Sequence, residues 1–397
     1  MPMIRRYFAG LSRNTFLLAI ASLFADISTE MLYPVLPIFL TQVLHASGSI
    51  VGLVDGFAQA TQNIVQGLSG AVSDKLRRRK PVALVGYLLA AVAKPLMGMA
   101  AAWPALFGAR LLDRLGAGTR SAPRDALIAA SVAEKDRGRA FGLEGVGDNA
   151  GAFLGPLIAV FVLYVLQRDL RAIFYLAIVP GLLAFLMVLL VSERPAAVAA
   201  KAKIDLSLRQ FPRGYWIYLL VTALFSVGNS SNAFLILRTQ DAGATLETSI
   251  LIYAGYNLVA ALVSYPAGGL SDRWGRRALL LVAFVVFAIA YLGFALSADV
   301  AVLGALFGLY GAHQGIFRAV GKAFASDFVP DHLRASGIGW YGATVGLLQL
   351  LASLVAGVLW DQVGHAAVFF YGAASAIVGS VALLALVPRQ RPRLASP

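Results

Sequence analysis

The chain has 397 residues, of which 59% are hydrophobic and 13% charged, and its mean hydropathy is +0.76. A soluble domain carries about 25% charged residues, so this composition excludes a soluble globular protein and predicts one embedded in a lipid bilayer. Cysteine is absent and the four histidines are scattered, which excludes disulfides and a thiolate metal site, and we expect neither a metal nor a cofactor.

Apolar segments long enough to span a bilayer, about 20 residues each, follow one another along the chain. The basic N-terminal residues precede such a segment without a small-residue cleavage site, which favours a first membrane helix over a removed signal peptide. Twelve helices are predicted: 15–42, 48–72, 81–100, 103–131, 140–166, 172–192, 214–238, 246–270, 278–297, 300–327, 335–360 and 366–387. We therefore predict an all-α membrane protein with twelve transmembrane helices, in which a polar linker, 193–213, joins two six-helix bundles, 1–192 and 214–397.

Lysine and arginine are unevenly distributed over the predicted loops. Most of the 33 fall in the two termini, the linker and the loops that follow even-numbered helices, whereas the opposite loops carry only Arg168 and Arg171. Because positively charged loops stay on the cytoplasmic side, both termini are predicted to be cytoplasmic, in the cell (inner) membrane. The net charge of +13 follows from this topology and from anionic headgroups, so no nucleic-acid partner is expected.

A loop motif occurs twice. The copies are Gly70-Ala-Val-Ser-Asp74-Lys75-Leu-Arg-Arg78-Arg79 and Gly268-Gly-Leu-Ser-Asp272-Arg273-Trp-Gly-Arg276-Arg277. Their Asp residues lie 198 positions apart, which indicates that one half of the chain was duplicated. The first copy has Arg77 where the second has Gly275, and only glycine adopts positive φ without steric cost.

This motif, between helices 2 and 3 and again between helices 8 and 9, resembles the Gly-x-x-x-Asp-Arg/Lys-x-Gly-Arg-Arg/Lys loop of the major facilitator superfamily. Twelve spans in two sets of six resemble the same family, so the resemblance covers the whole chain. It implies a transporter in which helices 1, 4, 7 and 10 line a central cavity. The expected partners are a small-molecule substrate, protons and the lipid bilayer, and we expect a monomer.

The predicted fifth helix carries a stripe of small residues on one face. Its members are Gly147, Gly151 and Gly155, followed by Pro156. Glycines four residues apart let helices approach closely, and proline bends a helix. The stripe resembles the core of a motif found in exchangers of the superfamily, although Ala159 replaces a further expected glycine. Close packing alone and a role in antiport both remain open.

Carboxylates inside predicted helices are candidates for proton coupling. An ionisable group at bilayer depth costs at least about 2.5–3.5 kcal/mol on insertion scales, so it normally faces a bundle interior or water. The candidates are Asp26, Glu30, Asp55, Glu144 and Asp148, all in the N-terminal half. Desolvation disfavours the charged form of a carboxylate, so such a group can take up and release a proton in each cycle. Permanent pairing with Arg110, Arg114 or Lys94 is the alternative.

The cations of the predicted fourth helix have counterparts in the tenth. An offset of 198 maps Arg120 onto Arg318 and Arg124 onto Lys322. Such cations could bind an anionic or carboxylate-bearing substrate near the repeat interface, or they could pair with nearby aspartates and hold the cytoplasmic side closed. Both interpretations stay open.

Two further sets of residues complete the predicted site. The substrate-cavity candidates are Arg110, Asp113, Arg114, Arg120, Arg318, Asn229, Asn232, Tyr253, Tyr256, His313 and Gln314. The candidate cytoplasmic gate consists of Gly70, Asp74, Arg78, Arg79, Arg124, Asp125, Gly268, Asp272, Arg273, Arg276, Arg277 and Lys322. The uncharged polar residues could instead simply join helices.

These features predict a secondary active transporter. Proton-coupled antiport that exports a small solute is the first interpretation, and proton-coupled uptake of an anionic or carboxylate-bearing molecule is the alternative. A nontransporting membrane sensor is the alternative from another class. The sequence contains no nucleotide-binding loop, zinc-binding spacing or nucleophile elbow, so we do not expect an enzyme.

Overall fold

The computed structural model describes residues 10–76, 78–166, 169–193, 211–330 and 333–388, and these residues form helices, turns and loops without strands. Within that part of the chain, eight helices are long and apolar enough to cross a membrane. The prediction of an all-α membrane fold is therefore confirmed. The expected linker, 193–213, lies almost entirely outside the described residues.

The helices form two compact units. Unit 1 contains the described residues of 1–44 and 57–200, and unit 2 contains those of 45–56 and 201–397. Residues 45–56 thus group with the second unit, whereas the expected bundle boundary assigned them to the first.

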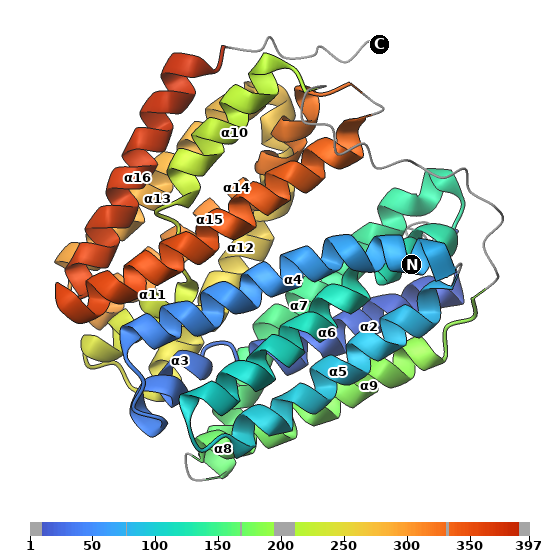
Figure 1. Cartoon of the computed structure of the whole chain (residues 1–397), viewed down its shortest axis with the longest axis horizontal. Helices are drawn as coiled ribbons and strands as arrows, with labels where there is room; N and C mark the ends of the chain where they lie inside the picture. Colours follow the sequence, from blue (N-terminus) through green and yellow to red (C-terminus); the bar gives the residue numbers. More distant parts are fainter. Residues whose placement is uncertain (1–9, 77, 167–168, 194–210, 331–332, 389–397) are drawn as a thin grey trace, which may run out of the picture. The chain divides into compact units, whose positions relative to one another are not determined.

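The long helices of unit 1 have similar inclinations in the view of Figure 1. Its elements are α2 (Arg13–Glu30), α3 (Leu36–Ile38), η1 (Phe39–Val43), most of α4 (Gly48–Leu76), α5 (Arg79–Met99), α6 (Trp103–Ala130), η2 (Glu134–Asp136), α7 (Arg137–Val165), α8 (Leu170–Leu176) and α9 (Ile178–Leu189). Helix α5 packs along α6, while α2 packs against α7 and α9. Leu18, Ile128 and Ala184, all fully buried, form part of the core between them.

Unit 2 has the same kind of organisation (Figure 1). Its helices are α10 (Arg213–Ser226), α11 (Asn232–Asp241), α12 (Leu246–Trp274), α13 (Arg276–Leu296), α14 (Val300–Asp327), α15 (Arg334–Gln362) and α16 (His365–Leu386). Helix α14 packs against both α12 and α13, and α13 also packs against α16.

Three of the expected continuous helices are interrupted. The helix expected at 15–42 stops at Glu30 and resumes at Leu36, and Pro34 within this break lacks a backbone N–H. The helix expected at 214–238 stops at Ser226 and resumes at Asn232, and the helix expected at 172–192 divides at Ala177. The first break stays largely apolar, so hydropathy does not mark it. The second, Val227-Gly-Asn-Ser-Ser231, is small and polar, a turn signal that the prediction of one continuous helix did not use. Interrupted helices at corresponding places in two repeats are a pointer to a transport site.

The two halves match helix by helix, but their offset changes within the duplicated loop. Helices α4 and α12 both have 29 residues and start 198 positions apart, whereas α5 and α13, with 21 residues each, start 197 apart. Residues 77–78 separate the first pair, and Gly275 alone, with φ of 88°, separates the second. The shorter turn needs the positive φ that glycine allows.

This shift corrects the predicted cation pairs. Helices α6 and α14, with 28 residues each, also start 197 positions apart, so Arg120 corresponds to Phe317 rather than Arg318. A difference of one residue rotates a side chain by about 100° around the helix axis. Accordingly, Arg120 is 8% exposed, whereas Arg318 and Lys322 are exposed. The proposed symmetry of Arg120 with Arg318, and of Arg124 with Lys322, is therefore wrong.

Asp361, near the end of α15, fixes the start of α4. Its carboxylate accepts hydrogen bonds from the backbone N–H groups of Gly48 and Ser49, both at 2.8 Å, and from Ser49 Oγ at 2.5 Å. These bonds satisfy orphan donors at the N-terminus of α4, but the acceptor belongs to another helix. Gly357 allows the contact, because a Cβ there would lie 2.6 Å from Ser49 Cα.

We expect Asp361→Ala to release the start of α4 from α15, since losing an N-cap costs about 0.5–2 kcal/mol. The chain has no native cysteine, so Val51→Cys, at a position 1% exposed, gives a single reporter. Maleimide should label it several-fold faster in the Asp361→Ala background. Asp299→Ala removes a cap formed within α14 and should leave labelling unchanged. Equal acceleration by both substitutions would contradict the interhelix role.

Candidate functional site

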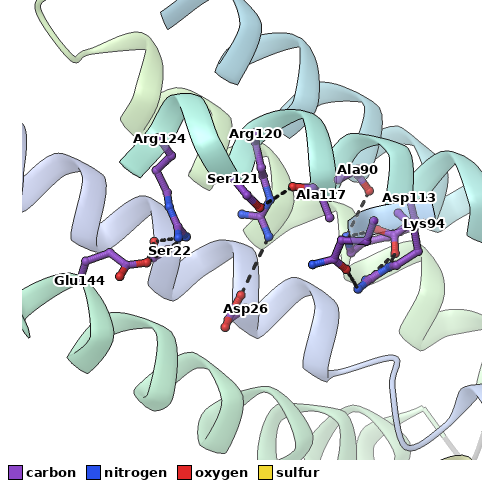
Figure 2. A network of polar contacts seen from close by, with 12 residues as sticks. Ser22, Asp26, Ala90, Lys94, Asp113, Ala117, Arg120, Ser121, Arg124 and Glu144 are labelled. Atoms are coloured by element: carbon purple, nitrogen blue, oxygen red, sulfur yellow. Dashed lines mark hydrogen bonds and ion pairs between the residues drawn. The ribbon is translucent and has the colours of Figure 1, made fainter. Parts of the chain in front are cut away.

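Three cations surround one carboxylate inside unit 1. Lys94 Nζ lies 3.0 Å from Asp113 Oδ1, while Arg110 Nη1 and Arg114 Nη2 lie 3.2 Å and 2.6 Å from Asp113 Oδ2. Lys94 also donates to the carbonyl of Ala90 at 3.1 Å (Figure 2). All four charged side chains are buried, so Asp113 supplies the negative charge that these cations share at their centre.

Two glycines bring α5 and α6 close enough for this cluster to form. A Cβ on Gly86 would lie 2.6 Å from the carbonyl oxygen of Gly116, and a Cβ on Gly116 would lie 2.5 Å from the backbone nitrogen of Ala90. Real Cβ atoms do not tolerate such distances to backbone, so the helix contact requires glycine at both positions. The contact places Lys94 of α5 beside Asp113 of α6.

Arg120 lies two turns beyond this cluster on α6 and points toward Asp26 of α2 (Figure 2). Its Nη2 is 3.9 Å from Asp26 Oδ1, longer than a hydrogen bond. The guanidinium carbon lies 4.7 Å from the ring centroid of Tyr87, a cation–π contact. Arg120 Nε and Nη1 are buried and have no hydrogen-bond partner.

Asp26 also faces a second carboxyl group. Asp148 of α7 is near enough to Asp26 for the two carboxyl groups to repel each other when both are ionised. A hydrogen bond between two carboxyl groups requires a proton on one of them, because an ionised carboxylate only accepts. The pair is thus a place where one proton can be held next to the guanidinium of Arg120.

The small-residue stripe of α7 produces this proximity. A Cβ on Gly147 would lie 2.4 Å from the carbonyl of Ala19, and one on Gly151 would lie 2.6 Å from the carbonyl of Leu23. Gly155 makes a similar approach further along α2. The stripe therefore packs directly on α2, and Asp148 lies beside it.

A second ion-pair group lies closer to the end of α6. Arg124 Nη1 is 2.9 Å from Glu144 Oε1 and donates to Ser22 Oγ at 2.9 Å (Figure 2). Its Nη2 is 2.9 Å from Asp125 Oδ1. Glu144 also accepts a hydrogen bond from Ser22. Arg124 therefore ties together α2, α6 and α7, all within unit 1.

The duplicated loops anchor the next helix through arginine. Arg79 Nη1 donates to the carbonyl of Ala126, and Arg276 Nη1 donates to the equivalent carbonyl, Ala323, at 2.6 Å. Arg276 is also 2.6 Å from Asp327. Arg78 and Arg273 are exposed, and Gly70 and Gly268 lie inside α4 and α12. Arg277 donates hydrogen bonds to two backbone carbonyls near the end of α16. The side chains of Asp74 and Asp272 fall outside the described part of the structure.

In unit 2 the predicted polar residues meet at the break between α10 and α11. Asn232 donates to Tyr256 Oη at 3.2 Å and accepts from Tyr310 Oη at 2.8 Å. Ser231, in the break, donates to Asp55 Oδ2 at 2.5 Å. Asp55 therefore belongs to unit 2, whereas Asp26, Glu144 and Asp148 belong to unit 1.

The remaining predicted residues of unit 2 lie in an aromatic core. His313 is fully buried, stacks on Phe317, and has Nδ1 2.8 Å from the carbonyl of Ala283. Tyr253 packs against Tyr256. The side-chain oxygens of Asn229 and Gln314 are buried without a hydrogen-bond partner, so these two amides stay candidates for ligand contact.

At the corrected offset of 197, the charged cluster of unit 1 matches aromatic residues in unit 2. Lys94 corresponds to Tyr291, Asp113 to Tyr310 and Arg120 to Phe317. The ring centroids of Tyr291 and Tyr310 are 5.9 Å apart. Their counterparts in unit 1, Lys94 and Asp113, form an ion pair. The duplicated helices keep their packing, but charged residues of unit 1 are replaced by aromatic residues in unit 2.

The sequence reading treated Lys94 only as a possible ion-pair partner and did not include Tyr87 among the site residues. Lys94 carries the sole charge of the predicted helix 81–100, which could have marked it as a site residue. Tyr87 had no such signal, because aromatic residues are common in membrane helices and its contact with Arg120 depends on how α5 packs on α6.

Two units of corresponding helices, interrupted helices and buried charged residues are features of a multi-pass membrane transporter. The chain belongs to the major facilitator superfamily, because the family model Major Facilitator Superfamily matches residues 18–237 and 218–397. The resemblance inferred from the loop motif is thereby confirmed.

Relatives and solved structures agree with this assignment. The chain is 36% identical to an uncharacterised MFS-type transporter of Methanocaldococcus jannaschii, over 94% of this chain and 95% of that protein. It is 27% identical to a probable 4-methylmuconolactone transporter of Cupriavidus pinatubonensis, over 75% and 72% of the two chains. Its fold is similar to that of a D-xylose–proton symporter, with a TM-score of 0.78 at 17% identity, covering 95% of this chain and 98% of the other. The nucleoside transporter NupG gives a TM-score of 0.77 at 17% identity, with coverage of 96% and 100%.

Proposed function

We propose that the protein is a proton-coupled antiporter that exports a small solute across the cell (inner) membrane, with both termini in the cytoplasm. The observation that carries this proposal is the pair of Asp26 and Asp148 beside Arg120. Asp26 has two competing partners, since it can share a proton with Asp148 or attract the guanidinium. Proton binding and the position of Arg120 are therefore linked.

The strength of that link is large enough to drive a conformational cycle. Two unit charges 4 Å apart interact by about 4 kcal/mol at an effective dielectric constant of 20, and 4 kcal/mol changes an equilibrium roughly a thousand-fold. Protonation of Asp26 removes this attraction to Arg120. Proton release restores it, so each proton event favours a different arrangement of α2, α6 and α7.

The direction of transport is proposed from α7. Its stripe of Gly147, Gly151 and Gly155 resembles the exchanger motif and holds Asp148 against α2. Close contact between these two helices holds the two carboxyl groups near each other, while the side chain of Asp26 remains 22% exposed. Protons entering down their gradient would then be exchanged for a solute leaving the cell.

Flux measurements in liposomes test this proposal. With an imposed pH gradient, we expect one member of a solute panel to trigger proton movement in the opposite direction to the solute. The panel should include small organic acids and lactones, given the relative named as a 4-methylmuconolactone transporter. Asp26→Asn and Asp148→Asn should abolish the coupled proton flux, while Glu134→Gln, whose side chain is 88% exposed, should not. Unchanged coupling in both asparagine variants would refute the assignment.

A second candidate function is proton-coupled uptake of an anionic or carboxylate-bearing molecule. The cluster of Lys94, Arg110 and Arg114 around Asp113 favours it. Arg110 also lies 5.9 Å from the ring of Tyr33, in the break after α2. In the same liposomes, accumulation of an anion together with protons would support uptake, and absence of flux with every solute would favour a sensor.

A further inference from the structure

We propose that a small cavity inside unit 1 binds a monatomic anion, chloride. The cavity lies among α2, α5, α6 and α9, and its polar lining comes from Ser28, Thr29, Tyr87, Lys94 and Arg120. It has room for about one water molecule. No carboxylate lines it.

The two cations and the tyrosine at this cavity are hydrogen-bond donors, whereas the hydroxyl of Ser28 already donates to the carbonyl of Ala177. Arg120 is 8% exposed, and among the described residues its Nε and Nη1 have no hydrogen-bond partner. Tyr87 is 2% exposed, and its hydroxyl also has no partner. Lys94 gives two of its three N–H donors to Ala90 and Asp113. Unsatisfied donors on two buried cations are a binding site for negative charge.

Charge distinguishes an anion from a water molecule in this place. A buried ion without compensation carries a penalty of several kcal/mol. The carboxylate of Asp26 approaches a different nitrogen of Arg120, with Oδ1 3.9 Å from Nη2. Water would accept a hydrogen bond from Nε or Nη1 but would bring no charge. A monatomic anion satisfies the donors and neutralises the guanidinium, whereas carboxylates, sulfate and phosphate exceed the available space.

The corresponding positions of unit 2 carry different side chains. The position of Ala90 is occupied in unit 2 by Phe287, and that of Arg120 by Phe317. Phe287 stacks on Tyr291, with ring centroids 3.9 Å apart. Large side chains therefore fill in unit 2 the space that unit 1 leaves beside its cations.

Thermal unfolding of the purified full-length protein in detergent tests the site, with sodium salts of chloride, bromide, sulfate and gluconate compared at constant ionic strength. We expect chloride and bromide to raise the unfolding midpoint with a saturable dependence, and sulfate and gluconate to give no such rise. Tyr87→Phe, which removes one hydroxyl, should weaken halide affinity roughly ten-fold, the usual contribution of a hydrogen bond to a charged group. Tyr164→Phe, at a position 85% exposed, is the matched control and should leave affinity unchanged.

A second measurement locates the ion. Crystals grown in bromide should show an anomalous peak within hydrogen-bonding distance of Arg120 and Tyr87, and Arg120→Gln should remove it. Three results would each overturn the proposal. They are equal stabilisation by all four anions, halide affinity that is unchanged in Tyr87→Phe, and a density peak without anomalous signal, which would mean bound water. These experiments need no proton gradient and no transported solute, so their outcome is independent of the proposed antiport.

Discussion

Asp113→Asn should lower the stability of the protein by about 3–5 kcal/mol, the usual cost of removing one partner from a buried ion pair. Lys94, Arg110 and Arg114 all contact this carboxylate within 3.2 Å, and Asp113 is 1% exposed. The amide keeps the size of the side chain but removes its charge, so three buried cations repel one another. The loss should appear as a large fall in the midpoint of thermal unfolding in detergent.

Two comparisons separate this effect from a general loss of charge. Asp125→Asn removes a carboxylate that is 42% exposed, and it should cost less than about 1 kcal/mol, as exposed pairs do. Adding Lys94→Met to Asp113→Asn should recover part of the stability, because one of the unpaired cations is gone. If the free energy of unfolding of Asp113→Asn lies within about 1 kcal/mol of that of the unmodified chain, Asp113 does not hold the cluster together.

Gly151→Val should be the second strongly destabilising change, because it forces α7 away from α2. A Cβ at this position would lie 2.6 Å from the carbonyl of Leu23 and 2.8 Å from Cβ of Asp26. These are backbone and near-backbone atoms that cannot move alone, so overpacking should cost at least about 1–3 kcal/mol. Asp26 would shift away from Asp148 at the same time, and coupled proton flux in liposomes should fall together with the unfolding midpoint.

Gly145→Val provides the matched control on the same helix. No atom lies within 4 Å of a Cβ at Gly145, so valine there changes only helix propensity, by well under about 1 kcal/mol and in the stabilising direction. Equal losses of stability and flux in the two variants would show that valine itself, rather than the contact between α2 and α7, is responsible.

Much of the fold could be predicted from local sequence, because lipid imposes a simple rule. A segment of the chain in a bilayer must satisfy its own backbone hydrogen bonds, so a long apolar stretch is helical whatever its neighbours are. The six helices that begin at Gly48, Arg79, Trp103, Arg137, Arg276 and Val300 therefore start within a few residues of their predicted positions. The loop motif identified the family for a different reason. It is recognised by residue types at fixed spacing, although its arginines contact residues that are distant in sequence.

The breaks at 31–35 and 227–231 could not be predicted this way. The first lies inside an apolar stretch. The second is locally polar, and it is stabilised by contacts that are distant in sequence, such as Ser231 with Asp55 and with Ser353. The same limit applies to charge pairing. Asp26 and Glu30 were equivalent candidates in the sequence, but packing of α2 on α7 gives Asp26 a carboxyl neighbour, Asp148, and an arginine, Arg120.

The sequence by itself determined that this chain is a duplicated, all-helical membrane protein of the transporter superfamily, because hydropathy, charge bias and a repeated loop are local properties. Only the tertiary structure decided the register between the halves. One residue fewer at Gly275 changes the offset from 198 to 197, and a shift of one residue turns a helix by about 100°. Because of that rotation, Arg318 is not the counterpart of Arg120, and the charged cluster of unit 1 corresponds to aromatic residues in unit 2. This asymmetry depends on which side chains face the interior of each unit.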